Sequence, residues 1–256
     1  MTTTLSALYR YPVKGFSPEP LERTVLETSG YFPGDRLYAI ENGDSGFDPV
    51  APRHQPKTKY LMLMRDEALA RLRTRYDDAT ATLTVEADGE TVVAKLDTAA
   101  GRATLEDLMR RRLPDALRGE PRVLAAPEHT GYRFTDSKIG YVSLINLASV
   151  RAVEEYVGAP VDPLRFRGNL HVEGLAPWAE LEMVGRVLEA RSGLRLKLTK
   201  RTVRCAATNV DPVSGARDLD IPWAIDAHLG HRDCGVYAEV IAGGMLAVGD
   251  TLTAIG

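Results

Sequence analysis

Cysteine is nearly missing from this chain of 256 residues, which has only Cys205 and Cys234. Two cysteines are too few for a disulfide framework, a four-thiolate zinc site or the four-cysteine cradle of an iron–sulfur cluster. A redox protein with this sequence would therefore take its electrons from a separate donor. The sequence also lacks the run of roughly 18 apolar residues that a membrane span needs and begins with no signal-peptide pattern. We expect a cytoplasmic protein with no membrane partner.

An excess of either charge is also missing. The chain has 32 Lys and Arg against 35 Asp and Glu, a formal net charge of -3, and 44% hydrophobic residues. A dedicated nucleic-acid-binding protein shows a basic excess, whereas these values are typical of an ordinary globular protein. We therefore expect a small-molecule substrate and no nucleic acid among the partners.

Several catalytic motifs are missing too. The sequence has no G-x-S-x-G elbow, no G-x-x-x-x-G-K-[ST] phosphate loop and no G-x-G-x-x-G after a strand, which argues against a serine hydrolase, a P-loop protein and a Rossmann protein. Among the histidines, only His228 and His231 lie three residues apart. No Glu-x-x-His frame or acidic third ligand accompanies them, which disfavours a zinc site.

The first part of the chain alternates between short strands and turns. We predict a strand in LSALYRYPVKG that ends in a loop carrying Lys14, and strands around 24–27 and 37–40. Asp88-Gly89 between two alternating runs predicts a β-hairpin. Apolar residues at helical spacing predict a helix over 65–76. A second helix is predicted in TLEDLMRRRLP, with Thr104 as its N-cap and Pro114 closing it.

Residues 114–138 are rich in proline, glycine and charge, and we place a boundary here between domains at 1–120 and 121–256. Beyond it, one apolar helical face predicts a helix that ends at Gly158. That face consists of Leu147, Val150, Val153, Tyr156 and Val157. Many short strands with glycine-rich turns follow. We predict a mainly β fold with helices, of the α+β class, in which helices pack outside a barrel or sandwich.

Cys205 lies in the segment KRTVRCAATNVDP, close to Lys200, Arg201 and Arg204. Neighbouring cations favour a thiolate over a thiol, and a thiolate is the form that binds metals and attacks electrophiles. The alternative is a small, buried and inert side chain, which is the usual fate of a free cysteine. The local sequence leaves both interpretations open for Cys205, and it leaves the role of Cys234 undetermined.

In order along the chain, these fragments resemble a known family. LYRYPVKG, GYFPGDRLYAI and PRHQPK resemble the N-terminal β-barrel domain that precedes MOSC domains. VSLINLASV, RFRGNLHVEG, KRTVRCAATNVDPVSG and GVYAEVIAGGMLAVGD resemble the MOSC domain itself, which is named for the C-terminal part of molybdenum-cofactor sulfurase. The resemblance spans nearly the whole chain. It implies an N-terminal β-barrel-like domain followed by a MOSC β-barrel with peripheral helices.

The resemblance implies a molybdenum cofactor, a pterin that carries a phosphate and holds the metal through a dithiolene. In the reductases of this family, such as the mitochondrial amidoxime-reducing component, one protein cysteine is a further metal ligand, and Cys205 matches it. Lys14 and Arg36 match the cations that hold the phosphate. Arg167 and Asn169 match an R-x-N element beside the metal, so the resemblance makes them catalytic residues together with Cys205.

The resemblance assigns further residues to cofactor binding. Those implied to contact the pterin or to lie near it are Arg53, Asn146, Ser149, Thr202 and Asp211. The family's reductases often carry a serine after the lysine of the YPVK motif. This chain has Gly15 there, so one hydroxyl contact to the phosphate is missing or is replaced by backbone.

Two functions follow from this resemblance. The first is an enzyme: a molybdenum-dependent oxidoreductase that reduces N-hydroxylated or other N-oxygenated compounds, with electrons from an external donor of the ferredoxin or flavin reductase type. The second is a non-redox carrier, which binds the cofactor or holds sulfur as a persulfide on Cys205 and delivers it to another enzyme.

Overall fold

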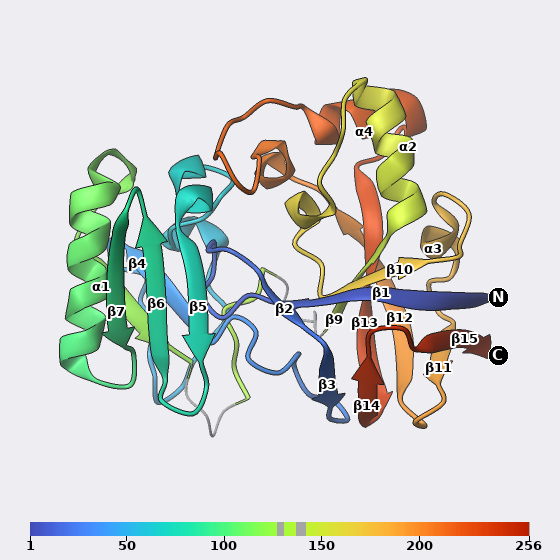
Figure 1. Cartoon of the computed structure of the whole chain (residues 1–256), viewed down its shortest axis with the longest axis horizontal. Coiled ribbons are helices and arrows are strands. Elements are labelled where there is room, and N and C mark those ends of the chain that lie inside the picture. Colours follow the sequence, from blue (N-terminus) through green and yellow to red (C-terminus); the bar gives the residue numbers. More distant parts are fainter. Residues whose placement is uncertain (127–130, 137–141, 256) are drawn as a thin grey trace.

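The computed structural model describes residues 1–126, 131–136 and 142–255, and these form two lobes (Figure 1). One lobe holds α1 (Ala99–Arg112) and a three-stranded sheet, and the other holds a larger barrel. No helix in the described residues is long and apolar enough to cross a membrane.

Strands make up most of the regular structure. They are β1 (Thr2–Arg10), β2 (Glu19–Leu21), β3 (Arg23–Leu26), β4 (Tyr38–Asn42), β5 (Arg73–Asp77), β6 (Thr82–Ala87), β7 (Glu90–Lys95), β8 (Pro121–Ala125), β9 (Val142–Asn146), β10 (Leu170–Glu173), β11 (Val187–Ala190), β12 (Arg195–Val203), β13 (Asp233–Ala242), β14 (Gly244–Ala247) and β15 (Thr251–Ile255). Besides α1, the helices are α2 (Leu147–Val157), α3 (Ala179–Glu182) and α4 (Ile221–Leu229). The short 3-10 helices are η1 (Lys57–Lys59), η2 (Glu67–Arg71), η3 (Pro114–Ala116), η5 (Pro163–Phe166) and η6 (Ala206–Asn209).

The barrel is a closed ring of seven strands within the described residues, in the order β10, β9, β13, β12, β11, β15 and β1, with β1 pairing back onto β10. Strand β1 therefore belongs to the barrel although it begins the chain. Alternate residues of these strands point inward, as the period of a strand requires. The buried interior includes Leu5, Leu144, Leu196, Leu198, Val236 and Val240.

The smaller lobe packs α1 against the three-stranded sheet β5–β6–β7 and the pair β4–β8. Leu83 and Val85 of β6 and Leu105 and Leu108 of α1 are fully buried in one apolar core. The predicted hairpin at Asp88-Gly89 is confirmed. Both residues have positive φ, 47° and 82°, which is the geometry of a two-residue type I′ turn.

The helix predicted over 65–76 is wrong. The structure has η2 followed directly by β5, which pairs along its length with β6. Leu69, Leu72 and Tyr76 are buried there, so the apolar positions are correct. The spacing of these residues also fits a short helical turn that leads into a strand, and pairing with β6 decides between the two structures.

The helix predicted in TLEDLMRRRLP exists, but its predicted N-cap is wrong. Helix α1 starts six residues earlier than predicted, and the Thr98 hydroxyl caps it by accepting a hydrogen bond from the Gly101 N–H (3.0 Å). Thr104 lies inside the helix and donates to the Ala100 carbonyl. The first turn carries small residues, so the apolar pattern that predicted the helix does not extend to its true start.

The other predicted elements are confirmed. The predicted strands around 24–27 and 37–40 correspond to β3 and β4. Helix α2 buries Val150 and Val153 and ends at Gly158, which has a φ of 67°. The predicted mainly β fold with helices and a barrel is confirmed. Residues 127–130, 137 and 138 of the segment in which we placed the domain boundary lie outside the described residues.

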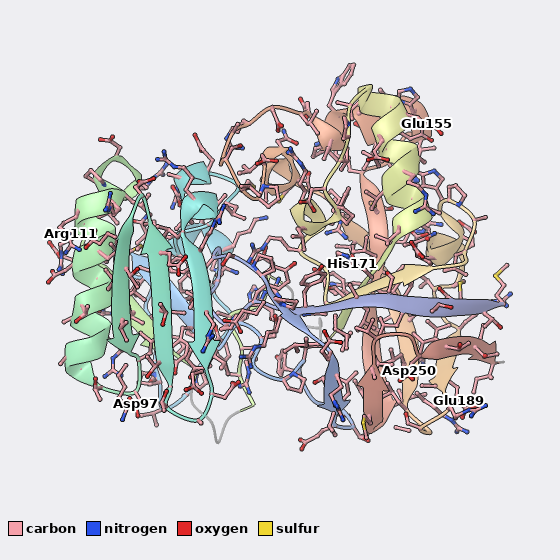
Figure 2. All side chains as sticks on the ribbon, viewed as in Figure 1. Asp97, Arg111, Glu155, His171, Glu189 and Asp250 are labelled. Carbon is pink, nitrogen blue, oxygen red and sulfur yellow. The ribbon has the colours of Figure 1, made fainter. Side chains whose placement is uncertain are left out.

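Figure 2 shows how charge is distributed over this fold. Arg111 lies on the outer side of α1 and Glu155 on α2, and both are exposed, whereas His171 of β10 lies near the middle of the view and is only 3% exposed. Most charged side chains thus face solvent. The buried exceptions include Lys14 and Glu180, which lie in two different polar environments.

Candidate functional site

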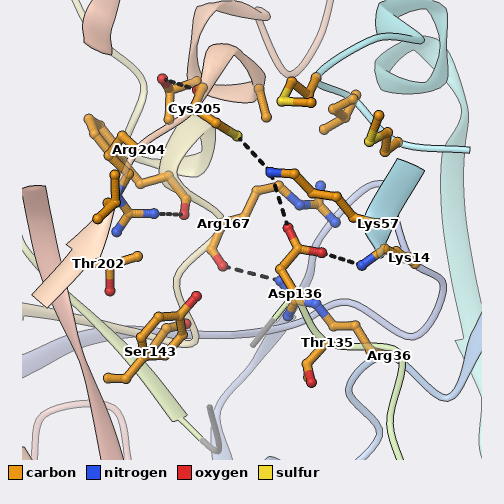
Figure 3. Close-up of a pocket in the computed structure, with 18 of the residues that line it drawn as sticks. Lys14, Arg36, Lys57, Thr135, Asp136, Ser143, Arg167, Thr202, Arg204 and Cys205 are labelled. Atoms are coloured by element: carbon orange, nitrogen blue, oxygen red, sulfur yellow. Dashed lines mark hydrogen bonds and ion pairs between the residues drawn. The ribbon is translucent and has the colours of Figure 1, made fainter. Parts of the chain in front are cut away.

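A cavity of about 440 Å³ is lined by residues from both parts of the chain (Figure 3). Its basic side chains are Lys14, Arg36, Lys57, Arg165, Arg167, Lys200, Arg201 and Arg204, and its acidic ones are Asp35 and Asp136. A cavity of this size is in the range of small-molecule and cofactor sites. Its balance of charge suits an anionic ligand. We call it the cationic cavity.

Cys205 lies at the rim of this cavity, where β12 ends and η6 begins, and it is partly exposed. The Lys57 Nζ lies 3.4 Å from its Sγ. Partial burial acts to lower the pKa of Lys57, but Cys205 and Asp136 outweigh it and raise that pKa. A cation therefore lies beside the sulfur, but it comes from η1, 148 residues away in the sequence, and not from the basic residues that neighbour Cys205 in the chain.

Lys14 is buried within the same cavity and is 6% exposed. Its Nζ donates to the Phe134 carbonyl (3.0 Å) and forms an ion pair with Asp136. Burial lowers the pKa of Lys14 despite this ion pair. Burial acts to raise the pKa of Asp136, but Lys14, Lys57 and Arg36 outweigh it and lower that pKa to about 2. Asp136 is therefore an anion held among cations.

Arg36 and Arg167 stack on the same aromatic ring. Their guanidinium carbons lie 4.4 Å and 4.3 Å from the centre of the Tyr11 ring. Arg36 donates to both carboxylate oxygens of Asp35 at 2.6 Å, while Arg167 donates through Nη1 to the Phe16 carbonyl at 2.8 Å. Both arginines have positive φ, 49° and 54°. Such strained residues persist only where surrounding contacts hold them, and they cluster at ligand-binding sites.

Three buried polar atoms on residues that line this cavity have no hydrogen-bond partner in the described structure. They are Nη2 of Arg167, Oγ1 of Thr202 and Nε of Arg165. Burial and the neighbouring Arg36 lower the pKa of Arg167 to about 10. Because buried polar groups are nearly always paired in folded proteins, these atoms point to a ligand that completes them.

Asn169 also lines the cavity but uses its amide within the protein. Its Oδ1 accepts from the N–H and the hydroxyl of Ser143 (3.1 and 2.9 Å), and its Nδ2 donates to the Tyr9 carbonyl (3.1 Å). Asn169 thus ties β1, β9 and the turn before β10 together. It shapes this wall of the cavity.

The Arg204 side chain bonds to backbone carbonyls of the barrel lobe. Its Nε donates to the Cys234 carbonyl (2.7 Å) and its Nη1 to the Phe166 carbonyl (2.8 Å). Cys234 is fully buried, and burial raises the pKa of its thiol to about 12. The two cysteines therefore differ: Cys205 faces the cavity, and Cys234 is an inert part of the core.

Asn146 and Ser149 lie away from the lining of the cationic cavity, in a second polar site. Both are 0% exposed and both donate to the buried carboxylate of Glu180, at 2.9 Å from the Asn146 Nδ2 and at 2.8 and 2.9 Å from the Ser149 Oγ. The Gly235 N–H also donates to Glu180, and the Trp178 N–H donates to Ser149. We call these groups the Glu180 cluster.

The other predicted residues lie at the surface or in a neighbouring turn. Arg53 is exposed and does not line the cavity. Asp211 forms an ion pair with Arg165 at 3.2 Å and accepts N–H bonds from Val213 and Ser214. Those bonds and that ion pair lower its pKa although partial burial opposes them. Asp211 therefore organises a turn.

The structure thus brings six predicted residues to one cavity: Lys14, Arg36, Arg167, Asn169, Thr202 and Cys205. Sequence reasoning missed Lys57, Asp136 and the apolar wall formed by Met62, Leu63 and Met64. Lys57 ends the segment PRHQPK, which the resemblance had already singled out. Nothing in the local sequence marks the others. No group of three or more His, Cys, Asp or Glu side chains that could hold a metal occurs in the described part of the chain.

Comparison with solved structures gives a likeness over the whole chain and one over a part. The YuaD protein from Bacillus subtilis is similar over 99% of this chain and 96% of its own, with 13% identity and a TM-score of 0.45. YiiM from Geobacillus stearothermophilus is similar over 46% of this chain and 55% of its own, with 19% identity and a TM-score of 0.36. No curated protein sequence matches the chain significantly.

Family models match most of the chain. The model of the MOSC N-terminal beta barrel domain matches residues 2–113, and that of the MOSC domain matches residues 132–253. The first match contains Lys14 and Arg36, and the second contains Arg167, Thr202 and Cys205. The residues that meet in the cationic cavity therefore come from both domains. The chain belongs to the MOSC family, which is associated with binding of the molybdenum cofactor.

Proposed function

We propose that the chain binds the molybdenum cofactor in the cationic cavity and reduces N-hydroxylated or related N-oxygenated compounds. The observation that carries this proposal is the meeting of Cys205 with Lys14, Arg36 and Arg167 around one cavity of about 440 Å³. A soft sulfur ligand suits molybdenum, and lysine and arginine suit a phosphate. These are the two ends of this cofactor.

The residues present fit such a group. The unpartnered Nη2 of Arg167 and Oγ1 of Thr202 need an acceptor that the protein does not supply. A phosphate or a pterin offers acceptors to both. The lowered pKa of Lys14 and of Arg167 shows that the described protein disfavours charge at these two side chains. An anionic ligand would offset that cost.

Each residue then has a role that its position allows. Cys205 would hold the metal, and Lys57 would keep a positive charge 3.4 Å from its sulfur. Lys14, Arg36 and Arg167 would hold the phosphate, with Tyr11 fixing the two guanidinium planes. Asn169 would help to fix the segment of chain that carries Arg167. When bound, the cofactor supplies the oxygen-accepting and electron-transferring chemistry that no side chain provides.

The reaction needs a partner. Reduction of an N-hydroxyl group to an amine consumes an electron pair and a pair of protons and releases water as the N–O bond breaks. The described residues hold no redox centre of their own, because Cys234 is buried and Cys205 stands alone at the cavity. We propose an external donor of the ferredoxin or flavin reductase type.

A second function is favoured by the contact between Lys57 and Cys205. A lysine beside a partly exposed sulfur stabilises a persulfide anion as well as a thiolate. A carrier that holds sulfur on Cys205 and delivers it to another enzyme would use the same pair. It would have less need of the buried cations on the other side of the cavity.

Metal and pterin analysis together with turnover separates these functions. The protein would be purified from a host that makes the cofactor, as wild type, Cys205→Ser and the control Cys234→Ala, and assayed anaerobically for benzamidoxime reduction with an artificial donor. We expect molybdenum, pterin and turnover in the wild type and the control, with molybdenum and turnover lost in Cys205→Ser. A molybdenum-loaded wild type without turnover would contradict the reductase, and persulfide without molybdenum would favour the carrier.

A further inference from the structure

One guanidinium outside the cavity joins its two walls. Arg217 lies in the chain between η6 and α4, and its Nη1 donates to the carbonyl of Ala206 (3.1 Å), the residue after Cys205. Its Nη2 donates to the carbonyls of Leu63 (3.1 Å) and Met64 (2.8 Å). An arginine fork is planar and rigid, so it fixes the groups that it bonds relative to one another.

A carboxylate completes these contacts. Glu67 of η2 accepts from the Nε and Nη2 of Arg217 at 3.2 and 3.1 Å. The acceptors Leu63, Met64 and Glu67 belong to the N-terminal domain. Ala206 and Arg217 belong to the MOSC domain. Arg217 is thus a contact between the two domains at the level of Cys205.

The turn that carries Arg217 is itself tightly held. Val210 and Arg217 form an antiparallel bridge, and the Asp211 N–H donates to the Ala216 carbonyl at 2.8 Å. Gly215 has a φ of 73°, and a Cβ there would lie 3.0 Å from the Glu67 carbonyl. The turn therefore packs directly on η2, and a side chain at position 215 would push the two apart.

These contacts bear on the space in front of Cys205. Ala207 and Thr208 line one side of the cavity after Cys205, and Met62, Leu63 and Met64 line it from the other domain. Arg217 bonds the backbone of both sides, at Ala206 and at Leu63 and Met64. Arg217 therefore ties the backbone beside Cys205 to the wall from the other domain.

We propose that Arg217 is a positioning residue that holds the Cys205 loop against the 62–64 segment and so sets the size of the molecule that reaches the Cys205 sulfur. The inference concerns access in the protein alone and holds whether the chain is a reductase or a carrier. For either function, the selected ligand is one whose body passes an apolar wall of methionine and leucine side chains.

Alkylation of Cys205 in cofactor-free protein tests this directly. The wild type would be reacted at one pH with iodoacetamide, which is small, and with N-(1-pyrenyl)maleimide, which is bulky. Cys234 is 0% exposed and does not compete, and Cys205→Ser gives the blank. The measured quantity is the ratio of the two second-order rate constants, because a general change in thiol reactivity cancels in it.

Arg217→Gln removes the charge-assisted bonds to both walls, so it should raise the rate with the bulky reagent at least about tenfold and change the rate with the small reagent little. Arg217→Lys should give an intermediate ratio, because one ammonium cannot reach both walls. Glu67→Gln keeps the carbonyl contacts and should raise the ratio less than Arg217→Gln. The control Arg232→Gln, which removes only a surface pair with Asp226, should leave the ratio unchanged.

An unchanged ratio in Arg217→Gln, with a lowered melting temperature, would overturn the proposal and make Arg217 a structural contact only. Equal acceleration of both reagents would do the same, because it would show general loosening. Should Arg217→Gln fail to fold, Arg217→Lys and Glu67→Gln decide: an unchanged ratio in both overturns the proposal. Because the assay contains no molybdenum, failure of the proposed enzymatic function leaves its outcome untouched.

Discussion

The cationic cavity and the Glu180 cluster are both built from buried polar side chains, yet they differ in how completely those side chains are paired. In the Glu180 cluster, the carboxylate accepts from Asn146, Ser149 and the Gly235 N–H. In the cationic cavity, Arg167 and Thr202 each keep a buried atom without a partner. A polar group that pairs within the protein stabilises the fold, whereas one left open stabilises a bound ligand instead.

Charge separates the two sites as well. The pKa of Lys14 and that of Arg167 are both lowered, first by burial, so the protein alone pays for keeping these side chains charged. The Glu180 cluster surrounds a carboxylate with donors instead. We therefore expect substitutions in the cluster to change stability and substitutions in the cavity to change ligand binding.

The largest effect is expected for Glu180→Ala. It removes the acceptor shared by three buried donors, and leaving buried donors unpaired costs about 1–3 kcal/mol for each. We expect the free energy of unfolding to fall by at least about 3 kcal/mol in urea denaturation. The matched control is Glu182→Ala on the same short helix, where the carboxylate is exposed and its ion pair among the described residues is with Arg201. A loss as small as that of the control would remove the structural role of the cluster.

The next effect concerns a buried histidine outside both sites. Burial and the neighbouring Arg204 lower the pKa of His171 to about 4 from its usual 6.5. Between these values the unfolded chain takes up a proton that the folded chain refuses, so stability falls as the pH drops through this window. The loss should reach about 3 kcal/mol by pH 4.

This prediction is measured as the difference in urea stability between wild type and His171→Phe from pH 7 to pH 4. The variant has no titrating ring and should show a flatter profile across the window. His228→Gln, at an exposed position of α4, is the comparison variant. Parallel profiles for wild type and His171→Phe would show that His171 is protonated in the folded protein.

Removal of two buried hydroxyls should change the free energy of unfolding in different directions. Ser149→Ala removes a hydroxyl that donates to Glu180 and accepts from the Trp178 N–H, and it should lower the free energy of unfolding by about 2 kcal/mol. Thr202→Val keeps the shape and removes a buried hydroxyl without a partner, so it should leave stability equal or raise it by up to about 1 kcal/mol. The cofactor content of purified protein should fall in Thr202→Val alone. Equal destabilisation by both substitutions would erase the distinction between the sites.

The fold was predictable where one local signal decided the structure. Asp88-Gly89 fixes a hairpin because both residues tolerate positive φ, and Gly158 ends α2 for the same reason. The segment after Arg65 was not predictable, since its apolar spacing fits a helix as well as a turn followed by a strand, and only pairing with β6 decides. The closure of the barrel by β1 was hidden too, because its partners lie more than 160 residues away.

The residues of the cavity were likewise predictable only where a local motif marked them. Lys14, Arg36 and Cys205 carry motifs, and the structure brings them to one cavity, although their binding of a cofactor stays a prediction. Asp136 and Met64 lie in no motif. They could not be predicted, because a loop residue meets its neighbours only when the two domains pack together. Asn146 and Ser149 show the converse case. Their motif predicts a helix start, and in the structure the side chains at that start bond to Glu180.

The smallest effect is expected for Asp136→Asn. The carboxylate pairs with Lys14 and is half exposed, so water screens much of the interaction and the loss of stability at pH 7 should stay below about 1 kcal/mol. The pKa of Asp136 is about 2 in the folded chain against an ordinary 3.8. Its contribution is therefore present above pH 3.8 and is lost as the pH falls through 2. Melting curves at pH 7 and pH 3 should show a smaller difference for Asp136→Asn than for the wild type.

At pH 7 the variant should also bind inorganic phosphate more tightly in calorimetry, because Lys14 and Lys57 then lack the anion they pair with. Weaker phosphate binding would mean that the carboxylate orders these cations for the ligand and does not compete with it, and the cavity would then resemble the Glu180 cluster more than its open atoms indicate.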